Sequence, residues 1–412
     1  MKIGIVSQWY PPEPGTFIPA SLAEGLAARG HAVRVLTGFP NYPEGRIYPG
    51  FRQRWTGRTT SGGVTVRRVP LYPSHDLSPV RRSANYLSFG ATSSLAAVRF
   101  LADVDVLYVY HPPATAFAAA AVGRLLHRTP VVLHVQDVWP ESVTASSMVR
   151  QGRTRELLHR SLASVMHRIY RASSAVVVIA PSMRELVLQR GAAADKTHVV
   201  LNWADESLFY PVPATDESRR AIGYRDRCTV MYAGNMGLFQ DIPGAVRAAA
   251  AVDDRVDLVL VGSGLDEEPA RALASQLGVQ NVRFLGRRTP ADMAALYAAA
   301  DFQLISLRDV PTARGTIPSK LQAALACGSP VLASVPGDCA RLVQRDGVGI
   351  ACPPGDWQAL ADRFAQAASV SPTALADMGR RARQTYERDM SQRAGIDQIE
   401  KILLSAAQER TR

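Results

Sequence analysis

The chain is poor in cysteine and has no long apolar run, and both absences exclude whole classes of protein. Its 412 residues hold four cysteines, at spacings that fit neither a zinc site nor a disulfide framework. Apolar runs such as Ala114–Val122 are far shorter than the roughly 20 residues of a membrane-spanning helix. The first residues lack a signal-peptide pattern and predict a buried strand, so we expect a cytoplasmic protein.

The motifs of several enzyme classes are also missing. The sequence contains no GxSxG, HExxH, Walker or kinase pattern, which argues against the common hydrolase, metalloprotease and nucleotide-triphosphate enzymes. No acidic pair of the DxD kind stands at a strand end near the expected phosphate loops. We therefore expect neither a metal site nor a cofactor.

Positive charge is unevenly distributed along the chain. Residues 1–205 hold 23 lysines and arginines against 12 carboxylates, whereas residues 206–412 hold 24 of each. The whole net charge of +11 therefore lies in the first half, which predicts a polyanionic partner such as an acidic membrane surface or a phosphate-bearing acceptor. Nucleic acid is not expected, because no basic stripe with interleaved aromatic residues accompanies the charge.

Apolar strands that alternate with helical segments are abundant. In the first half they predict strands at Ile3–Ser7, Val33–Thr37, Val64–Val69, Val104–Tyr110, Val131–Val135, Val176–Ile179 and Val199–Leu201. In the second half they predict strands at Thr229–Tyr232, Val256–Val261, Val282–Leu285, Phe302–Ile305 and Pro330–Ala333. Strands that are apolar on both faces and separated by helices indicate an α/β fold with two parallel, doubly wound sheets.

The segment Asn202–Asp216, rich in proline and acidic residues, separates the two halves. We predict a Rossmann-like N-terminal domain over residues 1–205 and a Rossmann-like C-terminal domain over residues 206–385. A helix over residues 386–412 is expected to pack back on the first domain. Ligands of open α/β sheets bind at the carboxyl ends of the strands, so we expect the site residues there, in a central cleft that both domains face.

Glycine-bearing turns follow consecutive strands of the second half. Asn235, Gly237 and Gln240 follow the first of these strands, and Gly262 and Gly264 follow the next. Arg287 follows the third strand, beside a glycine that exposes backbone groups. Two such turns at one sheet edge predict a nucleotide-binding site more strongly than a single GxG would.

The segment Arg314–Lys320 is the sharpest phosphate-binding pattern in the chain. Gly315 and Thr316 supply backbone N–H donors, Ser319 can cap the following helix, and Arg314 and Lys320 place positive charge near its N-terminus. Helix dipole, N–H groups and positive charge together suit a diphosphate. The alternative interpretation is a solvated, well-capped helix start.

Polar residues also leave the strands of the first half. Gly15 and Thr16 end the loop after the first strand, at the start of a helix, where an anion can bind backbone N–H groups. His134 and Asp137 stand at the end of one strand and His111 at the end of its predicted neighbour. The alternatives are an ordinary strand-to-helix turn and structural histidines.

Together these pieces resemble the retaining GT-B glycosyltransferases of family 4, over essentially the whole chain. The likeness is greatest to the subgroup that builds bacterial surface polysaccharides, which includes fucosamine and colanic-acid transferases. It is carried by the segments Trp9–Gly15, Gln136–Ser142, Asn202–Trp203, Tyr232–Gly237 and Pro318–Lys320.

The chain departs from the family pattern in three places. Many members carry Arg and Lys on the loop after the first strand of the second domain, where this chain has Asn235 and Gln240. Many also carry a Glu-x7-Glu pair, where this chain has Gly315 and Ala323. A histidine often directly precedes the aspartate that corresponds to Asp137, and here it stands two residues earlier, at His134.

The resemblance implies retaining transfer of a hexose or N-acetylamino sugar from a nucleotide-diphosphate sugar, with UDP the expected nucleotide. The acceptor would be a lipid-linked glycan or a small molecule, held by the first domain. The expected catalytic residues are His111, His134, Asp137 and Lys320. The expected donor-binding residues are Gly15, Thr16, Asn235, Gly237, Gln240, Gly262, Gly264, Arg287, Arg314, Gly315, Thr316, Ser319 and Lys320.

Two other functions stay open on the same fold. A UDP-sugar 2-epimerase would bind the donor but no acceptor, and the basic first half argues against it. A non-catalytic sugar-nucleotide-binding protein is compatible with the missing carboxylates.

Residues 148–171 predict an amphipathic helix with basic flanks. Its apolar positions recur at helical spacing: Leu158, Leu162, Val165 and Ile169. Its basic positions are Arg153, Arg155, Arg160, Arg168 and Arg171. The helix either packs as an ordinary domain helix or turns its basic side, with Arg81, Arg82 and Arg99, toward anionic lipid at the inner face of the cell membrane.

Overall fold

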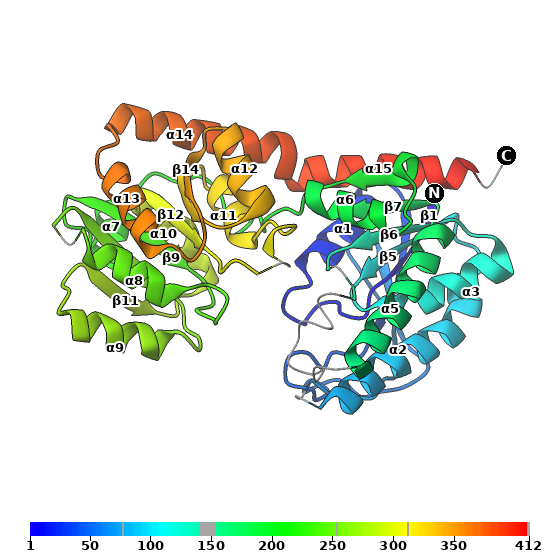
Figure 1. The fold of residues 1–412 in the computed structure, drawn as a ribbon. Helices are drawn as coiled ribbons and strands as arrows, with labels where there is room; N and C mark the ends of the chain where they lie inside the picture. Colours follow the sequence, from blue (N-terminus) through cyan, green and yellow to red (C-terminus); the bar gives the residue numbers. More distant parts are fainter. Residues whose placement is uncertain (76–77, 138, 141–152, 253, 311–312, 410–412) are drawn as a thin grey trace. The chain divides into compact units, whose positions relative to one another are not determined.

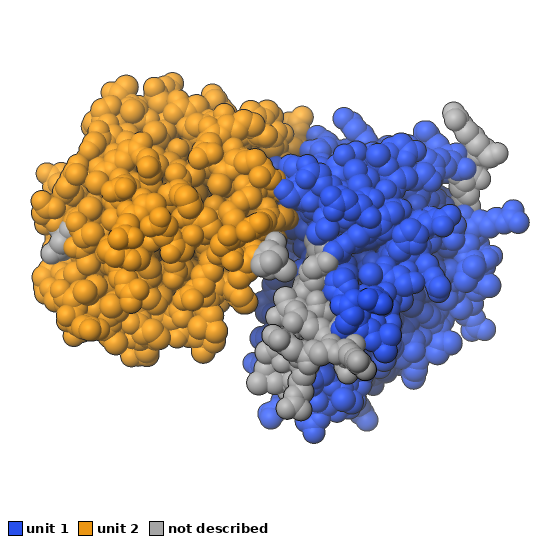
Figure 2. Space-filling model, viewed as in Figure 1, with its two compact units in different colours: residues 1–201, 395–412 blue, residues 202–394 orange. Residues whose placement is uncertain are grey.

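A computed structural model describes residues 1–75, 78–137, 139–140, 153–252, 254–310 and 313–409. The chain forms two compact units (Figures 1 and 2). Unit 1 comprises Met1–Leu201 and Gly395–Arg412, and unit 2 comprises Asn202–Ala394. Residues 148–152 of the amphipathic segment, and the side chains of residues 153–155, lie outside the description.

Unit 1 is built on an eight-stranded sheet in the order β3-β4-β2-β1-β5-β6-β7-β8. Neighbouring strands are parallel except at the edge, where β3 runs antiparallel to β4. The central strands are buried on both faces, as their Val, Ile and Leu content requires. The strands are β1 (Lys2–Val6), β2 (Ala32–Gly38), β3 (Arg58–Ser61), β4 (Val64–Val69), β5 (Val106–His111), β6 (Val131–Val135), β7 (Ala175–Val178) and β8 (Thr197–Val199).

Helices pack on this sheet, and the longest of them is α2. Its first turn is fixed by a proline at the start of the helix and by Ser78, whose side chain accepts a hydrogen bond from the Arg81 N–H. Helix α2 packs beside α3 (Figure 1). The helical segments of unit 1 are α1 (Phe17–Ala28), α2 (Pro79–Phe100), η1 (Ala114–Ala116), α3 (Phe117–His127), α5 (Arg153–Ala172), α6 (Pro181–Gln189), η2 (Ala194–Lys196) and α15 (Gln392–Glu409).

Helix α15 packs against residues 25–31 through ion pairs and through a close contact at a glycine. Arg29 pairs with Asp397 at 2.6 Å and with Glu400 at 2.5 Å, and His31 Nε2 lies 2.6 Å from Glu400 Oε1. A side chain at Gly25 would place its Cβ 2.3 Å from Ile396 Cδ1, so the glycine makes room for α15. The C-terminal helix therefore completes unit 1.

Unit 2 has a six-stranded, fully parallel sheet in the order β11-β10-β9-β12-β13-β14. The strands are β9 (Cys228–Ala233), β10 (Val256–Val261), β11 (Val282–Gly286), β12 (Phe302–Ser306), β13 (Val331–Ser334) and β14 (Gly349–Cys352). The helical segments are α7 (Asp216–Ile222), α8 (Ile242–Ala250), α9 (Glu267–Leu277), η3 (Pro290–Asp292), α10 (Met293–Ala299), α11 (Ser319–Ala326), α12 (Gly337–Arg345), α13 (Trp357–Ala367), α14 (Pro372–Thr385) and η5 (Tyr386–Met390). The predicted fold class, two α/β units with parallel sheets, is confirmed.

The strand order decides where the site residues meet. Strands β9, β10 and β11 are neighbours, so the loops that follow them lie side by side at one edge of unit 2. Strands β1, β5 and β6 are likewise neighbours in unit 1. None of the helices within the described ranges is long and apolar enough to cross a membrane.

Candidate functional site

Backbone contacts between glycine-bearing loops form the site edge of unit 2. The Gly234 N–H donates to the Val261 carbonyl at 2.9 Å, and the Gly262 N–H donates to the Gly286 carbonyl at 2.8 Å. A Cβ at Gly262 would lie 1.9 Å from the Gly234 oxygen, and one at Gly264 would lie 2.4 Å from the Met236 oxygen. Only glycine permits this stacking, which leaves backbone close to any ligand that binds there.

Lys320 lies in the first turn of α11, beside these loops. Its Nζ stands 5.0 Å from the centroid of the Tyr232 ring, and an added Cβ at Gly234 would lie 2.7 Å from Lys320 Cε. Burial lowers the pKa of Lys320 to about 8. An ammonium in this position, at a helix N-terminus and next to close-packed backbone, is suited to bind a phosphate.

The structure differs from the sequence prediction at the N-terminus of α11. The N-cap of α11 is Pro318, with no side-chain hydrogen bond, and Ser319 is an exposed first helical residue, so the prediction that Ser319 caps the helix is wrong. Arg314 is exposed and pairs with Asp309 at 2.9 Å. Gly315 and Thr316 are half-buried in the preceding turn.

The remaining donor residues of unit 2 support the loops themselves. Arg287 Nε donates to Ser263 Oγ at 2.6 Å, which ties the loop after β11 to the loop after β10. The Gly237 N–H donates to Gln240 Oε1 at 3.1 Å, so Gln240 closes its own turn. Asn235 is exposed at the same turn.

In unit 1, the loop that carries Gly15 and Thr16 is anchored by a buried carboxylate. Glu13 accepts hydrogen bonds from the backbone N–H groups of Tyr10 at 3.2 Å, Asn41 at 2.8 Å and Tyr42 at 2.9 Å. Burial raises the pKa of Glu13, opposed by these hydrogen bonds. Gly15 has a φ of +74° and open space around its missing side chain, so the turn geometry explains this glycine. The sequence analysis did not predict Glu13, because no pattern signals a carboxylate that binds backbone.

The two predicted histidines are buried at adjacent strand ends. His134 Nδ1 contacts the Tyr108 hydroxyl, and its Nε2 lies 2.8 Å from Gln136 Nε2. Neither ring nitrogen of His111 has a hydrogen-bond partner among the described residues, and its ring packs edge-on against Trp139 at 5.5 Å. Burial lowers the pKa of His111 to about 4 and that of His134 to about 3, so both rings are neutral at pH 7.

A cavity of about 660 Å³ opens next to this strand edge, within unit 1. Gly15, Thr16 and Asp137 line it, together with Gln136, whereas His111 and His134 are not among the described lining residues. Most of its wall is apolar, and the charged residues among its described lining are Arg82 and Asp137. Val138 and residues 141–142 of the predicted motif lie outside the described residues.

Aromatic rings form a continuous part of the cavity wall. Trp9 lies 5.6 Å from Tyr42 and 6.3 Å from Tyr86, and Tyr86 lies 6.4 Å from Trp139, between ring centroids. Tyr42 also packs against His75 at 4.5 Å. These residues come from segments spread over residues 9–139, so the sequence analysis missed the cavity.

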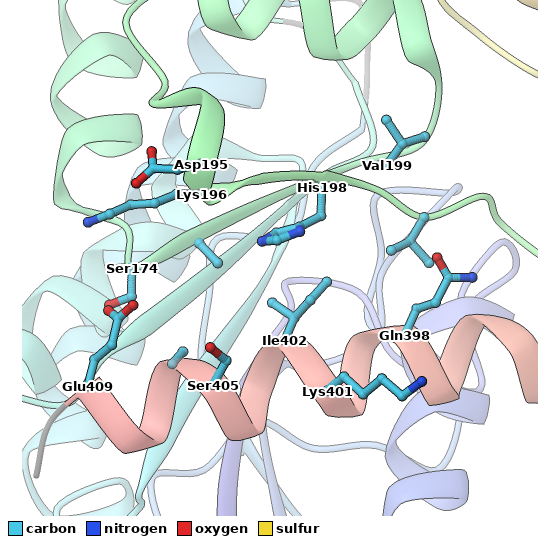
Figure 3. A pocket seen from close by; sticks show the side chains of 13 residues that line it. Ser174, Asp195, Lys196, His198, Val199, Gln398, Lys401, Ile402, Ser405 and Glu409 are labelled. Atoms are coloured by element: carbon cyan, nitrogen blue, oxygen red, sulfur yellow. The ribbon is translucent and has the colours of Figure 1, made fainter.

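A second cavity, of about 440 Å³, lies between β8 and α15 (Figure 3). Ile402 and Ala406 line it together with His198 and with charged residues of both signs. The side chains of Lys196 and Lys401 point away from one another in Figure 3, so their charges do not converge on a ligand. We assign no part of the site to this cavity.

Comparison with known proteins identifies the class to which this fold and these loops belong. A family model described as a glycosyl transferase 4-like domain matches residues 16–203, and a second, described as glycosyl transferases group 1, matches residues 227–369. The chain is therefore a glycosyltransferase of the family 4 and group 1 type, with the GT-B fold.

Individual relatives agree with this class. The chain is 27% identical over 343 residues to WcaI of Escherichia coli K12, which is named as a candidate colanic acid biosynthesis glycosyl transferase. The aligned region covers 80% of this chain and 82% of the relative. Its structure matches sucrose-phosphate synthase from Thermosynechococcus elongatus with a TM-score of 0.75 at 20% identity, over 98% of each chain. It also matches HepE from Anabaena in complex with UDP, with a TM-score of 0.71 at 19% identity, over 98% and 100% of the chains. These two structural likenesses show the fold.

Proposed function

We propose that the protein is a retaining glycosyltransferase that moves a hexose or N-acetylamino sugar from a UDP-linked donor to a lipid-linked glycan or small-molecule acceptor. The observation that carries this proposal is the half-buried Lys320 at the start of α11, beside the glycine loops of unit 2. The UDP in the similar HepE structure and the name of the Escherichia coli relative support the choice of donor and pathway class.

In this proposal unit 2 holds the donor. The nucleotide binds along the loops of Gly262 and Gly264, with Arg287 as a further contact, and Asn235, Gly237 and Gln240 contribute from the first loop. The diphosphate binds Lys320, the Gly315 N–H, the Thr316 and Ser319 side chains and the Arg314 guanidinium. Stabilisation of the leaving diphosphate by these groups is electrostatic catalysis.

Unit 1 would hold the acceptor in the aromatic cavity, where Gly15, Thr16 and Asp137 already converge. The acceptor hydroxyl would attack the sugar on the face that the diphosphate leaves, and the diphosphate would take the proton. Gly15 and Thr16 are proposed as donor-binding residues through the backbone N–H groups at the start of α1. His134 would act as a positioning residue for Gln136, and His111 would support the ring of Trp139.

A donor screen tests this function directly. Thermal stabilisation across nucleotide sugars should single out one donor, because a ligand at about 100 times its Kd adds roughly 2.7 kcal/mol to the free energy of unfolding. That donor should then be turned over with an added acceptor. Epimerised free sugar nucleotide would establish the 2-epimerase instead, and binding without turnover or hydrolysis would establish a non-catalytic binder.

Chelation tests the absence of a metal from the proposed mechanism. No group of three or more His, Cys, Asp or Glu side chains among the described residues is placed to hold a metal ion. We expect transferase activity to be unchanged in EDTA. Loss of activity in EDTA with recovery on adding magnesium or manganese would contradict the mechanism.

A further inference from the structure

The cavity of unit 1 has features that restrict the chemistry of its ligand. Most of its exposed wall is apolar, and aromatic rings, four prolines and three leucines contribute to it. The leucines are Leu87 of α2 and Leu158 and Leu162 of α5. Such a wall offers the apolar area that a hydrophobic part of a ligand needs.

Leu87 connects the cavity to the outside of α2. It lines the cavity, yet its side chain is 64% exposed, so the cavity opens at this residue. Val80, Leu95 and Val98 are also exposed, at 77%, 67% and 39%. Their spacing places them on the same face of the helix as Leu87, which makes an apolar stripe that continues outward from the cavity.

Arg82 contributes a positive charge to the lining of the cavity. Arg82 Nη2 donates to the Tyr86 hydroxyl at 3.3 Å, and Arg82 Nε is buried without a hydrogen-bond partner among the described residues. His75 also lines the cavity, and burial together with the Arg82 charge lowers its pKa. A guanidinium with an unsatisfied N–H is suited to bind a phosphate.

We propose that the cavity binds an amphiphilic acceptor, in which Arg82 binds a phosphate and the aromatic rings and Leu87 hold an aliphatic chain that leaves along α2. This inference rests on the proposed function, in which unit 1 holds the acceptor. It assigns to the acceptor a phosphate next to an apolar chain, which a soluble polyol or organic acid lacks.

The test measures binding by calorimetry to the full chain without donor, using geranyl monophosphate as the probe. Geraniol supplies the chain alone and inorganic phosphate supplies the charge alone. We expect the monophosphate to bind at least tenfold more tightly than either part. Binding of geraniol alone or of inorganic phosphate alone as tight as that of the monophosphate would overturn the proposal.

Matched variants locate the site. We expect Arg82→Gln to weaken binding of the monophosphate about tenfold or more, since a hydrogen bond to a charged group contributes about 1.5–3 kcal/mol and 1.4 kcal/mol is tenfold. Arg81→Gln, one position away and outside the cavity lining, should change it less than threefold.

Leu87→Asp should also weaken binding, whereas Leu125→Asp on α3, an exposed leucine outside the cavity, should not. Equal effects within either pair would overturn the proposal.

Donor binding is measured separately, so the two proposals can fail independently. If UDP binds and Lys320→Ala weakens it, but geranyl monophosphate does not bind, the amphiphile proposal fails and the donor half of the proposed function stands. If geranyl monophosphate binds as stated but no nucleotide sugar binds or reacts, the proposed function fails.

Discussion

Units 1 and 2 share a sheet architecture but build their candidate sites from different materials. In unit 2 the edge of the site consists of main chain: three glycine loops stack on one another, and the half-buried ammonium of Lys320 lies beside them. In unit 1 the cavity is made of side chains, most of them aromatic or aliphatic. Backbone groups suit a nucleotide diphosphate, which offers the same chemistry with any sugar, whereas a side-chain cavity can differ from one acceptor to another.

The charges differ between the units in the same sense. The net positive charge of the chain lies in residues 1–205, and so do all eight histidines. Unit 2 therefore contains no histidine, while unit 1 contains buried imidazoles and an excess of arginine. Variants and pH changes should affect the two units separately.

The largest expected effect comes from filling the backbone contact in unit 2. Gly262→Ala would place a Cβ 1.9 Å from the Gly234 oxygen, at a residue with a φ of +128°. We therefore expect the free energy of unfolding to fall by roughly 3–5 kcal/mol. We also expect the variant to lose donor binding. Gly278→Ala is the control: its φ is +67°, but no atom lies within 4 Å of the added Cβ. It should cost only about 1–2 kcal/mol. Equal losses in urea denaturation would show that the loop contact is unimportant.

Lys320→Ala should have the next largest effect, on turnover rather than on stability. Removal of a charge-assisted contact to the leaving diphosphate should raise the activation free energy by about 2–4 kcal/mol. This increase corresponds to a fall in kcat/KM of roughly 30-fold to 900-fold. Lys401→Ala, on α15 in unit 1, is the matched control and should leave steady-state kinetics unchanged. Catalytic efficiency near that of the wild type in Lys320→Ala would remove this residue from the site.

Acid should destabilise unit 1 through its buried histidines. The folded pKa values of His111 and His134, about 4 and about 3, lie below the unfolded value of about 6.5, so the unfolded chain takes up protons first as pH falls. The free energy of unfolding should therefore fall between about pH 6.5 and 4, by up to about 1.4 kcal/mol per pH unit for each histidine. We expect His134→Gln to reduce this slope in urea denaturation at pH 7 and pH 5. An unchanged slope would contradict the assignment of the acid sensitivity to that ring.

The contrast between the units also explains which features the sequence could predict. The glycine loops of unit 2 were found because backbone approach demands glycine at fixed places after strands, as at Gly262 and Gly264. Strands such as β6 were found because burial on both faces demands a continuous apolar run. Both signals are local in the sequence.

The features that the sequence analysis missed depend on long-range packing. Trp9, Tyr42, Tyr86 and Trp139 meet only after the sheet has formed, and none of them marks a cavity by itself. Helix α2 is rich in small and polar residues, with apolar residues on both its buried and its exposed sides, so its periodicity is weak. The edge strand β3 is exposed along its whole length and has no apolar alternation to reveal it.

The smallest expected effect is reversible binding to anionic membranes, which should depend on unit 1 alone. The C-terminal half of α5 packs in the core through Met166, Ile169 and Tyr170, as an ordinary domain helix does, while Arg168 and Arg171 remain exposed. Each basic residue near an anionic surface contributes about 1 kcal/mol, so Arg168→Gln should weaken vesicle binding about fivefold.

Sedimentation with liposomes distinguishes lipid contact from that ordinary packing. Binding should increase with the fraction of anionic lipid and decrease with salt, because surface charge is screened over about 8–10 Å at physiological ionic strength. Leu95→Asp should weaken binding further by interrupting the apolar stripe of α2, whereas Leu277→Asp on α9 of unit 2 should have no effect. Equal, negligible sedimentation with neutral and anionic vesicles would exclude the membrane contact. The amphiphilic acceptor would then have to reach the cavity from solution, and the exposure of Leu87 would need another explanation.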